Sequence, residues 1–444
     1  MRKMKESGLE WIGEIPYDWS ITKIKFILSN ENDSLKVGPF GSQLSGSDLV
    51  SEGYWVYSQR SVLDRDFEHN AMFISKDKFD SMKGFHVRAN DILITTRGTI
   101  GKICRVPKSF SEGILHPCII KFRIDEDKYS YKLLELIFNH SGILQKQLNF
   151  LSNATTIEVI YSGTLKNLQI PFPPLAEQKK IADFLDEKCG EIDSIKADVQ
   201  RQIELLNDYK KSVITEAVTK GLNPKAKLKD SGIEWIGKIP DHWGVKRFKY
   251  VADALYKGNG ITKEQVFFDG NTQCVRYGEI YSKYNISFSD CLSLTKSELI
   301  SSPQYFEHGD ILFAGTGELV EEIGKNIVYL GNERCLAGGD IVVARHSQNP
   351  SFLNYALGSS YCQSQKSSGK AKLKVVHISA TQIGNILVAL PPLSEQKEIA
   401  DYLDEKCSEI DAVVADKQKQ LETLDEYKKS LIFEYVTGKK EVAQ

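Results

Sequence analysis

The sequence has no excess of either charge and no long apolar run. Its 57 Lys and Arg residues balance 59 Asp and Glu residues, for a formal net charge of −2. This balance excludes a polybasic protein that binds nucleic acid by bulk charge. No apolar stretch approaches the ~18 residues of a membrane span, and the N-terminal MRKMKESGLE carries no apolar signal segment. We therefore expect neither a membrane protein nor a secreted one, and we expect the chain in the cytoplasm.

Motifs for metals, nucleophiles and nucleotides are also missing. The eight cysteines and eight histidines show no CxxC, HxH or HExxH spacing, so reduced thiols are expected, with no disulfide framework and no zinc site. No GxSxG elbow occurs, and GELVEEIGKN at 317–326 lacks the spacing of a phosphate-binding loop. FAGTG at 313–317 fits a pattern of S-adenosylmethionine-dependent methyltransferases, but no [N/D]PP[Y/F] element accompanies it. A strand that ends in a glycine turn is the favoured interpretation, and we expect no catalytic residue, metal or cofactor in this chain.

The sequence does contain an internal repeat. ESGLEWIGEIPYDW at 6–19 returns as DSGIEWIGKIPDHW at 230–243, with 9 of 14 positions identical. Residues 173–219 return at 391–437, with 31 of 47 positions identical and no insertion. Chance does not produce such identity at fixed spacing, so the chain is a tandem duplication. Its 444 residues, about three times the ~150 of one domain, therefore divide into two similar halves.

The segments between the repeated blocks have diverged. Residues 20–172 and 244–390 share only echoes, such as DILITTRGTIGK at 91–102 and DILFAGTGELVEEIGK at 310–325. Each mixes β-branched runs and turn residues with one helical stretch, at 131–148 or 350–366, which predicts an α+β domain with a mostly antiparallel, strongly curved sheet. The predicted strands include YWVYS at 54–58, DILITT at 91–96, ILHPCIIKFRI at 114–124, CVRYGEI at 274–280 and DIVVARH at 340–346. The predicted division is a first domain at 1–172, a helical region at 173–225, a second domain at 226–390 and a helical region at 391–444.

The repeated segment 175–219 has the period of a long helix. A Pro-Pro pair precedes each copy, and Gly221 and Gly438 follow them as helix stops. Apolar residues recur every seven positions as in a coiled-coil seam. The seam residues are Leu185, Ile192, Val199, Leu206 and Val213 in the first copy and Leu403, Ile410, Leu424 and Leu431 in the second. A second stripe is expected through Ile181, Ile195 and Tyr209. Two surface helices on separate domains would be the simpler alternative, and the sequence leaves the orientation of a helix pair open.

Each half of the chain contains, in order, an EWIGxIPxxW block, a variable segment of ~150 residues and PPLxEQxxIAxxLDEK at the start of a long helix. This arrangement, present twice, resembles the specificity subunit of type I restriction–modification enzymes. The resemblance covers residues 6–437 and is most specific in PPLAEQKKIADFLDEK at 173–188 and PPLSEQKEIADYLDEK at 391–406. It implies two tandem target recognition domains that each read half of a split DNA sequence. It also implies an antiparallel coiled coil with pseudo-two-fold symmetry.

The resemblance also implies partners. The coiled coil would dock two methyltransferase subunits, and restriction subunits would complete a complex used in phage defence. S-adenosylmethionine, ATP and Mg²⁺ would be bound by those partners, and this chain would be non-catalytic. Two alternatives stay open: a coiled-coil scaffold without a DNA role and, more distantly, a stand-alone methyltransferase that uses FAGTG.

Polar residues in turn-rich loops are candidates for DNA contacts. In the first domain Gln59 and Arg60 suit adenine and guanine edges, and the loop TTRGTIGK suits phosphates. The first-domain candidates are Ser42, Gln43, Gln59, Arg60, Arg97, Thr99 and Lys102. The second-domain candidates are Lys257, Asn259, Arg276, Tyr277, Thr316, Lys370, Lys372 and Lys374. Any one of these could instead be an ordinary exposed polar side chain, so the loops are safer candidates as groups.

Overall fold

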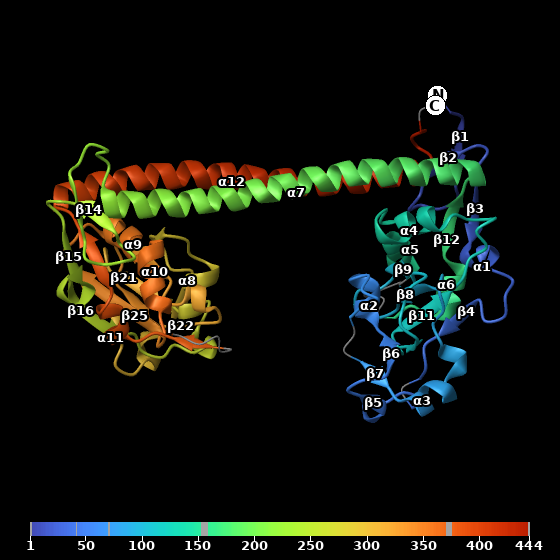
Figure 1. The fold of residues 1–444 in the computed structure, drawn as a ribbon, viewed down its shortest axis with the longest axis horizontal. Coiled ribbons are helices and arrows are strands. Elements are labelled where there is room, and N and C mark those ends of the chain that lie inside the picture. The colour runs from blue at the N-terminus through green and yellow to red at the C-terminus, as the bar shows by residue number, and fades with distance from the viewer. Residues whose placement is uncertain (1, 41, 70–71, 152–158, 370–374, 443–444) are drawn as a thin grey trace. The chain divides into compact units, whose positions relative to one another are not determined.

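The computed structural model describes residues 2–40, 42–69, 72–151, 159–369 and 375–442 (Figure 1). The chain forms two compact units. Unit 1 contains residues 1–199 and 419–444, and unit 2 contains residues 200–418. Each unit thus combines one variable segment with part of both long helices. The division into four consecutive segments stays a prediction, because the contacts of the chain group it differently.

Unit 1 contains two four-stranded sheets, in the orders β10-β6-β7-β5 and β4-β11-β8-β9, with two short strand pairs, β1-β2 and β12-β3. Its strands are β1 (Met4–Glu6), β2 (Glu14–Pro16), β3 (Ser20–Lys23), β4 (Leu35–Val37), β5 (Leu49–Val50), β6 (Tyr54–Tyr57), β7 (Phe73–Ile74), β8 (Ile92–Thr95), β9 (Ile103–Arg105), β10 (Gly113–Leu115), β11 (Ile119–Phe122) and β12 (Gln169–Phe172). Its shorter helices are α1 (Ile24–Ile27), α2 (Gln59–Leu63), α3 (Lys76–Ser81), α4 (Tyr131–Asn139), α5 (Ile143–Leu151) and α6 (Ser162–Asn167).

Unit 2 repeats this plan. Its larger sheets have the orders β16-β25-β21-β23-β18 and β19-β17-β24-β20. Its strands are β13 (Leu228–Asp230), β14 (Lys238–Pro240), β15 (Gly244–Arg247), β16 (Ala252–Lys257), β17 (Thr272–Val275), β18 (Ser287–Phe288), β19 (Ser293–Thr295), β20 (Tyr305–Phe306), β21 (Ile311–Ala314), β22 (Thr316–Gly317), β23 (Asn326–Tyr329), β24 (Cys335–Ala337), β25 (Ile341–His346), β26 (Val376–His377) and β27 (Leu387–Leu390). Its shorter helices are α8 (Tyr277–Ser282), α9 (Pro350–Gly358), α10 (Ser360–Ser367) and α11 (Ala380–Gly384).

The α+β class is confirmed, but the expectation of one sheet per domain is wrong. The run ILHPCIIKFRI divides into β10 and β11, since Pro117 between them has no N–H for a strand ladder and the chain moves there from one sheet to the other. Pairing is mostly antiparallel, but β6 with β10, β17 with β24 and β18 with β23 are parallel. The predicted strand CVRYGEI ends at Val275, where α8 follows. Both predicted helical stretches divide in two, the first beside Gly142, whose φ is +73°.

The first repeated block of each half packs against both long helices, α7 (Leu175–Lys220) and α12 (Leu393–Val436). In unit 1 the buried Trp19 donates from Nε1 to Glu177 Oε2 of α7 at 2.8 Å, and the core of unit 1 joins Trp19 to Val436 of α12. In unit 2 Trp243 donates to Glu395 Oε2 of α12 at 3.1 Å and packs with Val218 of α7. EWIGxIPxxW and PPLxEQ are therefore retained together because they contact each other.

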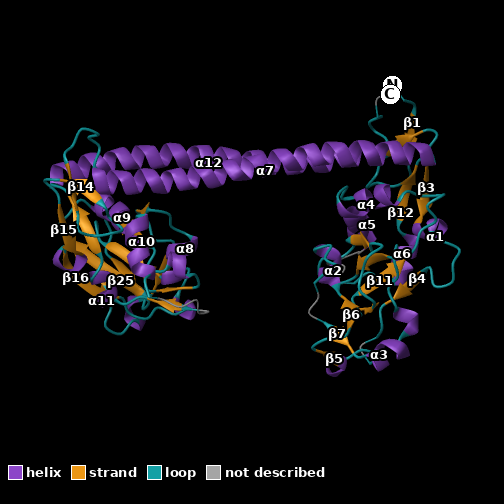
Figure 2. Ribbon diagram, in the orientation of Figure 1, coloured by secondary structure: helices purple, strands orange, loops and turns teal. Residues whose placement is uncertain are grey.

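The two long helices pair, and they are antiparallel. In unit 1 Lys196 and Asp193 of α7 bond to Asp425 and Lys428 of α12, so rising numbers on one helix meet falling numbers on the other. In unit 2 Lys210 bonds to Asp411 at 2.6 Å, which is the Asp193–Lys428 pair with the helices exchanged. Figure 2 shows α4 and α5 of unit 1 between the long helices and the strands β6 and β11. The core of unit 1 accordingly contains residues of α4, α5 and both long helices.

Most predicted seam residues are covered in this pairing. Buried are Leu185, Ile192, Val199, Leu403, Ile410 and Leu431, and half-buried are Leu206, Val213 and Leu424. Of the second stripe, Ile181 is buried, but Ile195 and Tyr209 are 49% and 56% exposed, so the stripe does not continue along the helix.

The second row of the seam follows the first by four residues. It contains Cys189, Ile203 and Ala217, with Lys196 and Lys210 between them. The aliphatic parts of these two lysines lie along the seam, and their amines bond to carboxylates. Because lysine is a charged residue, a search for apolar residues at seven-residue spacing does not find this row.

Candidate nucleic-acid interface

Four connections of unit 1 meet at one edge of its two larger sheets. Ile119, where β11 begins, pairs with Thr95, where β8 ends, and Val37 at the end of β4 pairs with the adjacent Ile120. Tyr57 at the end of β6 pairs with Leu115 at the end of β10. The connections that follow Val37, Tyr57 and Thr95, and the one that precedes Ile119, are called edge 1.

Five of the predicted DNA-contact residues are exposed at edge 1: Ser42, Gln43, Arg60, Arg97 and Thr99. Gln43 Oε1 accepts from the N–H of Phe40 at 3.1 Å. Arg60 is bonded to Asp64 one helical turn later at 3.0 Å, and both side chains are open to solvent, where such a pair is easily exchanged for another partner. Edge 1 thus presents cationic and amide donors to solvent.

Gln59 and Lys102 also lie at edge 1, but both side chains bond to the protein. In the amide orientation that gives both atoms a partner, Gln59 Nε2 donates to Arg97 O at 2.8 Å and Oε1 accepts from Thr99 N at 3.0 Å. Lys102 donates from Nζ to the carbonyl of Asn139 at the end of α4, and burial lowers the pKa of its amine. These two residues hold the loop from within.

Unit 2 has a corresponding edge. Lys257 at the end of β16 pairs with Val342, and Ala314 at the end of β21 pairs with Ile341. The connections that follow Lys257, Val275 and Ala314, and the one that precedes Ile341, are called edge 2. Backbone bonds join them, from Asn259 N to Ala337 O at 3.0 Å and from Gly315 N to Asp340 O at 2.7 Å.

The described second-domain candidates all lie at edge 2. Lys257 and Tyr277 are exposed, and Lys257 Nζ is 3.3 Å from Asp340. Asn259 donates to Ser302 O at 3.0 Å and so ties two loops. Thr316 is only 8% exposed, and its hydroxyl bonds to His377 Nδ1 at 3.0 Å. Lys370, Lys372 and Lys374 lie outside the described residues.

Arg276 lines a cavity of about 560 Å³ at edge 2, together with Lys263, Lys283 and four glycines. The buried Glu279 accepts from Arg276 N at 2.9 Å and from Lys283 Nζ at 2.9 Å. Although burial raises the pKa of Glu279, hydrogen bonds from Ser293 and Lys283 bring it below its usual value, so the carboxylate is charged. Among the described residues, Arg276 Nε has no hydrogen-bond partner. Asp340 also lines the cavity, so its three cations, Lys263, Arg276 and Lys283, exceed its two carboxylates by one.

The profile of the family described as "Type I restriction modification DNA specificity domain" matches residues 44–205 and 240–423. These two matches cover more than half of the chain and divide it as the repeat does. The chain belongs to this family. It is a specificity subunit of a type I restriction–modification system, a non-catalytic subunit that recognises DNA.

Individual relatives agree with this assignment. The chain is 26% identical, over 96% of its length and 93% of the relative, to the type I restriction enzyme MjaVIII specificity subunit of Methanocaldococcus jannaschii. It is 24% identical to the EcoKI specificity subunit of Escherichia coli K12 over 62% of this chain and 58% of that one. A solved structure on complex assembly and conformational transition of the type I R-M system contains a chain with a similar fold, with a TM-score of 0.68, 17% identity, and coverage of 95% of this chain and 98% of that one.

The residues of the glycine turn FAGTG form strands of the specificity subunit itself. The strand β21 ends within it, and Thr316 and Gly317 form β22, which pairs with β26. Within the described ranges no group of three or more His, Cys, Asp or Glu residues could hold a metal. In the same part of the chain, no helix is long and apolar enough to cross a membrane.

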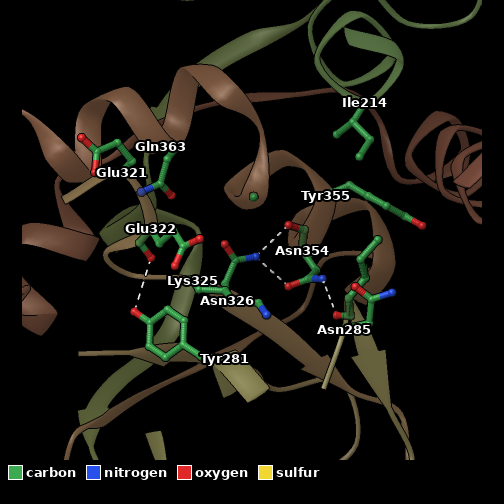
Figure 3. A pocket seen from close by; sticks show the side chains of 12 residues that line it. Ile214, Tyr281, Asn285, Glu321, Glu322, Lys325, Asn326, Asn354, Tyr355 and Gln363 are labelled. Atoms are coloured by element: carbon green, nitrogen blue, oxygen red, sulfur yellow. Dashed lines mark hydrogen bonds between the residues drawn. The ribbon is translucent and has the colours of Figure 1, made fainter. Parts of the chain in front are cut away.

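A polar cavity of about 370 Å³ lies beside α9 and α10 in unit 2 (Figure 3). Its side chains bond to each other and to backbone atoms. Asn326 Nδ2 donates to Asn354 Oδ1 at 2.7 Å, Asn354 donates to Ile286 O at 2.9 Å, and Tyr281 donates to Glu322 O at 3.3 Å. The bonded lining indicates a structural role for these amides in the specificity subunit.

An ion pair inside each variable segment was not anticipated from the sequence. Asp91, which is buried, bonds to Arg123 Nε at 2.5 Å, and Asp310 bonds to Arg345 Nη2 at 3.0 Å. Each aspartate also accepts a backbone N–H three residues before it, from Arg88 or Glu307. The echo between DILITT and DILFAG marks this contact and could have identified the two aspartates.

Proposed function

We propose that edge 1 and edge 2 each read one half of a bipartite DNA target. The observation that carries this proposal is that sheets of the same plan present equivalent edges whose exposed side chains differ. The contact groups are Ser42, Gln43, Arg60, Arg97 and Thr99 at edge 1, and Lys257, Arg276 and Tyr277 at edge 2. Gln59, Lys102, Asn259 and Thr316 shape the loops, and Lys370, Lys372 and Lys374 would add charge to the second half.

Cationic side chains at both edges would bond to phosphates and fix the position of each domain on DNA, and amides and arginines would distinguish base edges. The near-neutral chain then relies on local cations and on its partners for affinity. Catalysis of methylation and cleavage would belong to methyltransferase and restriction subunits, which would use S-adenosylmethionine, ATP and Mg²⁺. The complex would act in the cytoplasm.

We further propose that the long helices bind two methyltransferase subunits at equivalent patches. In unit 1, Ile195 and Tyr427 lie beside the Asp193–Lys428 pair, and both are about half exposed. In unit 2 the repeat places Val413 and Tyr209 beside the Lys210–Asp411 pair, again exposed. Two copies of one apolar patch suit two copies of one partner.

The test of DNA reading is to co-express the chain with its methyltransferase subunit and to map methylated adenines across a genome. Two short half-sites separated by a fixed gap are expected. A single continuous motif, or methylation without any motif, would contradict the proposal.

For the docking patches, Tyr427→Lys or Tyr209→Lys should each reduce the complex by one methyltransferase copy, as measured by native mass spectrometry. Loss of both copies from either single substitution would contradict two independent patches.

A further inference from the structure

The loop that follows β8 presents two of the exposed side chains of edge 1. Arg97 and Thr99 flank Gly98, whose φ of +64° lies in the left-handed region. Arg97 also forms an isolated antiparallel bridge with Val159. The directions of the Arg97 and Thr99 side chains therefore depend on what holds the backbone around Gly98.

Gln59 holds that backbone at two points. Its amide donates to Arg97 O at 2.8 Å and accepts from Thr99 N at 3.0 Å, so the two bonds span Gly98. A Cβ at Gly98 would lie 3.2 Å from the same amide, which leaves little room between them. Gln59 is the first residue of α2, and Ser58 caps that helix by accepting from Arg60 N at 3.3 Å. The glutamine is thus fixed by a capped turn before it reaches the loop.

We propose that Gln59 is a positioning residue that determines the specificity of the first DNA half-site without reading a base. A glutamine recognises adenine by a two-bond contact of its amide edge, and here that edge is already bonded to Arg97 and Thr99. Removing it would free the loop that carries both side chains. This inference rests on the proposed function of edge 1 and adds the cause of its loop conformation.

In unit 2 a different residue contacts the equivalent loop. Thr316 pairs with His377 as Arg97 pairs with Val159, so Gly317 occupies the place of Gly98. A Cβ at Gly317 would lie 2.8 Å from the hydroxyl of Tyr281, which comes from α8, the helix equivalent to α2. The loop is therefore contacted from the same helix in both units, by an amide in one and a phenol in the other.

The test compares Gln59→Leu with a matched control in the same unit. Gln147 makes the same pair of bonds, donating to Gln169 O at 3.0 Å and accepting from Gln169 N at 2.8 Å, but it is buried beside β12. In complex with the methyltransferase subunit, Gln59→Leu should relax at least one position of the first half-site by tenfold or more and leave the second half-site unchanged. Gln147→Leu should lower the melting temperature without changing the motif.

Two further measurements separate positioning from misfolding. Hydrogen exchange at the amide of Thr99 should become faster in Gln59→Leu, and Gln59→Glu, which keeps only an acceptor, should give an intermediate loss of discrimination. An unchanged first half-site in Gln59→Leu, or equal relaxation of both half-sites, would overturn the inference. Failure of the wild-type complex to methylate a bipartite motif would instead overturn the proposed function.

Discussion

Equivalent positions in units 1 and 2 fall into two groups: some make the same contact twice, and others have changed their chemistry. The first group holds the ends of the long helices and includes Trp19–Glu177 with Trp243–Glu395. The second group lies mostly in the sheets and at their edges, although the ion pairs Asp91–Arg123 and Asp310–Arg345 there are retained. The duplication has thus retained the contacts that define the fold and varied the residues that the fold presents.

A buried position shows how far this variation extends. Ile94 pairs with Ile103 in unit 1, and the corresponding pair in unit 2 is Phe313 with Asn326. Beside Asn326, the buried Lys366 donates to its Oδ1 at 2.8 Å, whereas the repeat offset places the buried Leu148 there in unit 1. Even the core has therefore changed between the units, from an apolar contact to a polar one.

The largest expected effect tests the retained contacts. Trp19→Ala and Trp243→Ala should each cost about 3–5 kcal/mol of unfolding free energy, since both indoles are 1% exposed and each bonds to a carboxylate. Trp235→Ala, at a repeat-block tryptophan that is 51% exposed, is the matched control and should cost far less. Chemical denaturation measures all three. A large loss of unfolding free energy from only one of the two buried-tryptophan substitutions would contradict the equivalence of the two contacts.

The buried aspartates of the two ion pairs should contribute different amounts to the unfolding free energy in the two units. Asp91→Asn should cost about 3 kcal/mol, because it removes the buried anion that faces both Lys121 and Arg123 and leaves Arg123 with only the exposed Glu31. Asp310→Asn should cost less, since Arg345 is 43% exposed and water can compensate. Urea denaturation of the two variants compares them. Equal losses would contradict the argument from exposure.

Lys366 gives unit 2 a pH dependence that unit 1 lacks at this position. Burial lowers the pKa of its amine from 10.5 to about 8. Between these two pKa values the unfolded chain binds a proton that the folded chain does not. The unfolding free energy therefore rises with pH at this site, by at most about 1.4 kcal/mol for each pH unit.

Lys366→Leu places the unit 1 residue at this position. The unfolding free energy of this variant, relative to that of the wild type, should therefore be highest below pH 8. This difference in unfolding free energy should shrink as the pH rises toward 10.5. Thermal denaturation of both proteins across this range measures the difference, and a difference that is independent of pH would contradict the buried, deprotonating lysine.

The smallest effect concerns phosphate contacts. Arg276→Ala should weaken binding of the complex to all DNA sequences alike and reduce the slope of log affinity against log salt by about one. Arg60→Ala, a candidate base reader at edge 1, should instead relax one position of the first half-site. Fluorescence anisotropy at several salt concentrations distinguishes the two. A changed motif in Arg276→Ala would assign Arg276 to base recognition.

Local pattern predicted the long helices well, because Pro173–Pro174 and Gly221 mark the ends of α7 and the seven-residue repeat marks its buried face. The second seam row escaped prediction, because Lys196 and Lys210 are charged residues whose partners are 200 or more positions away.

The edges were predicted as groups of loops, since strand ends carry turn residues. Which side chains bond inward, as Gln59 and Thr316 do, depends on contacts between loops 38 to 61 positions apart. No local pattern contains such contacts, so only the folded chain separates the residues that hold a loop from those that it presents.

The central claim is that each unit reads its own half-site on a common frame. The most direct test replaces residues 20–172 with the corresponding segment of another specificity subunit and maps methylated adenines with the same methyltransferase partner. The account predicts a new first half-site, with the second half-site and the gap unchanged. A change in both half-sites, or in neither, would contradict it.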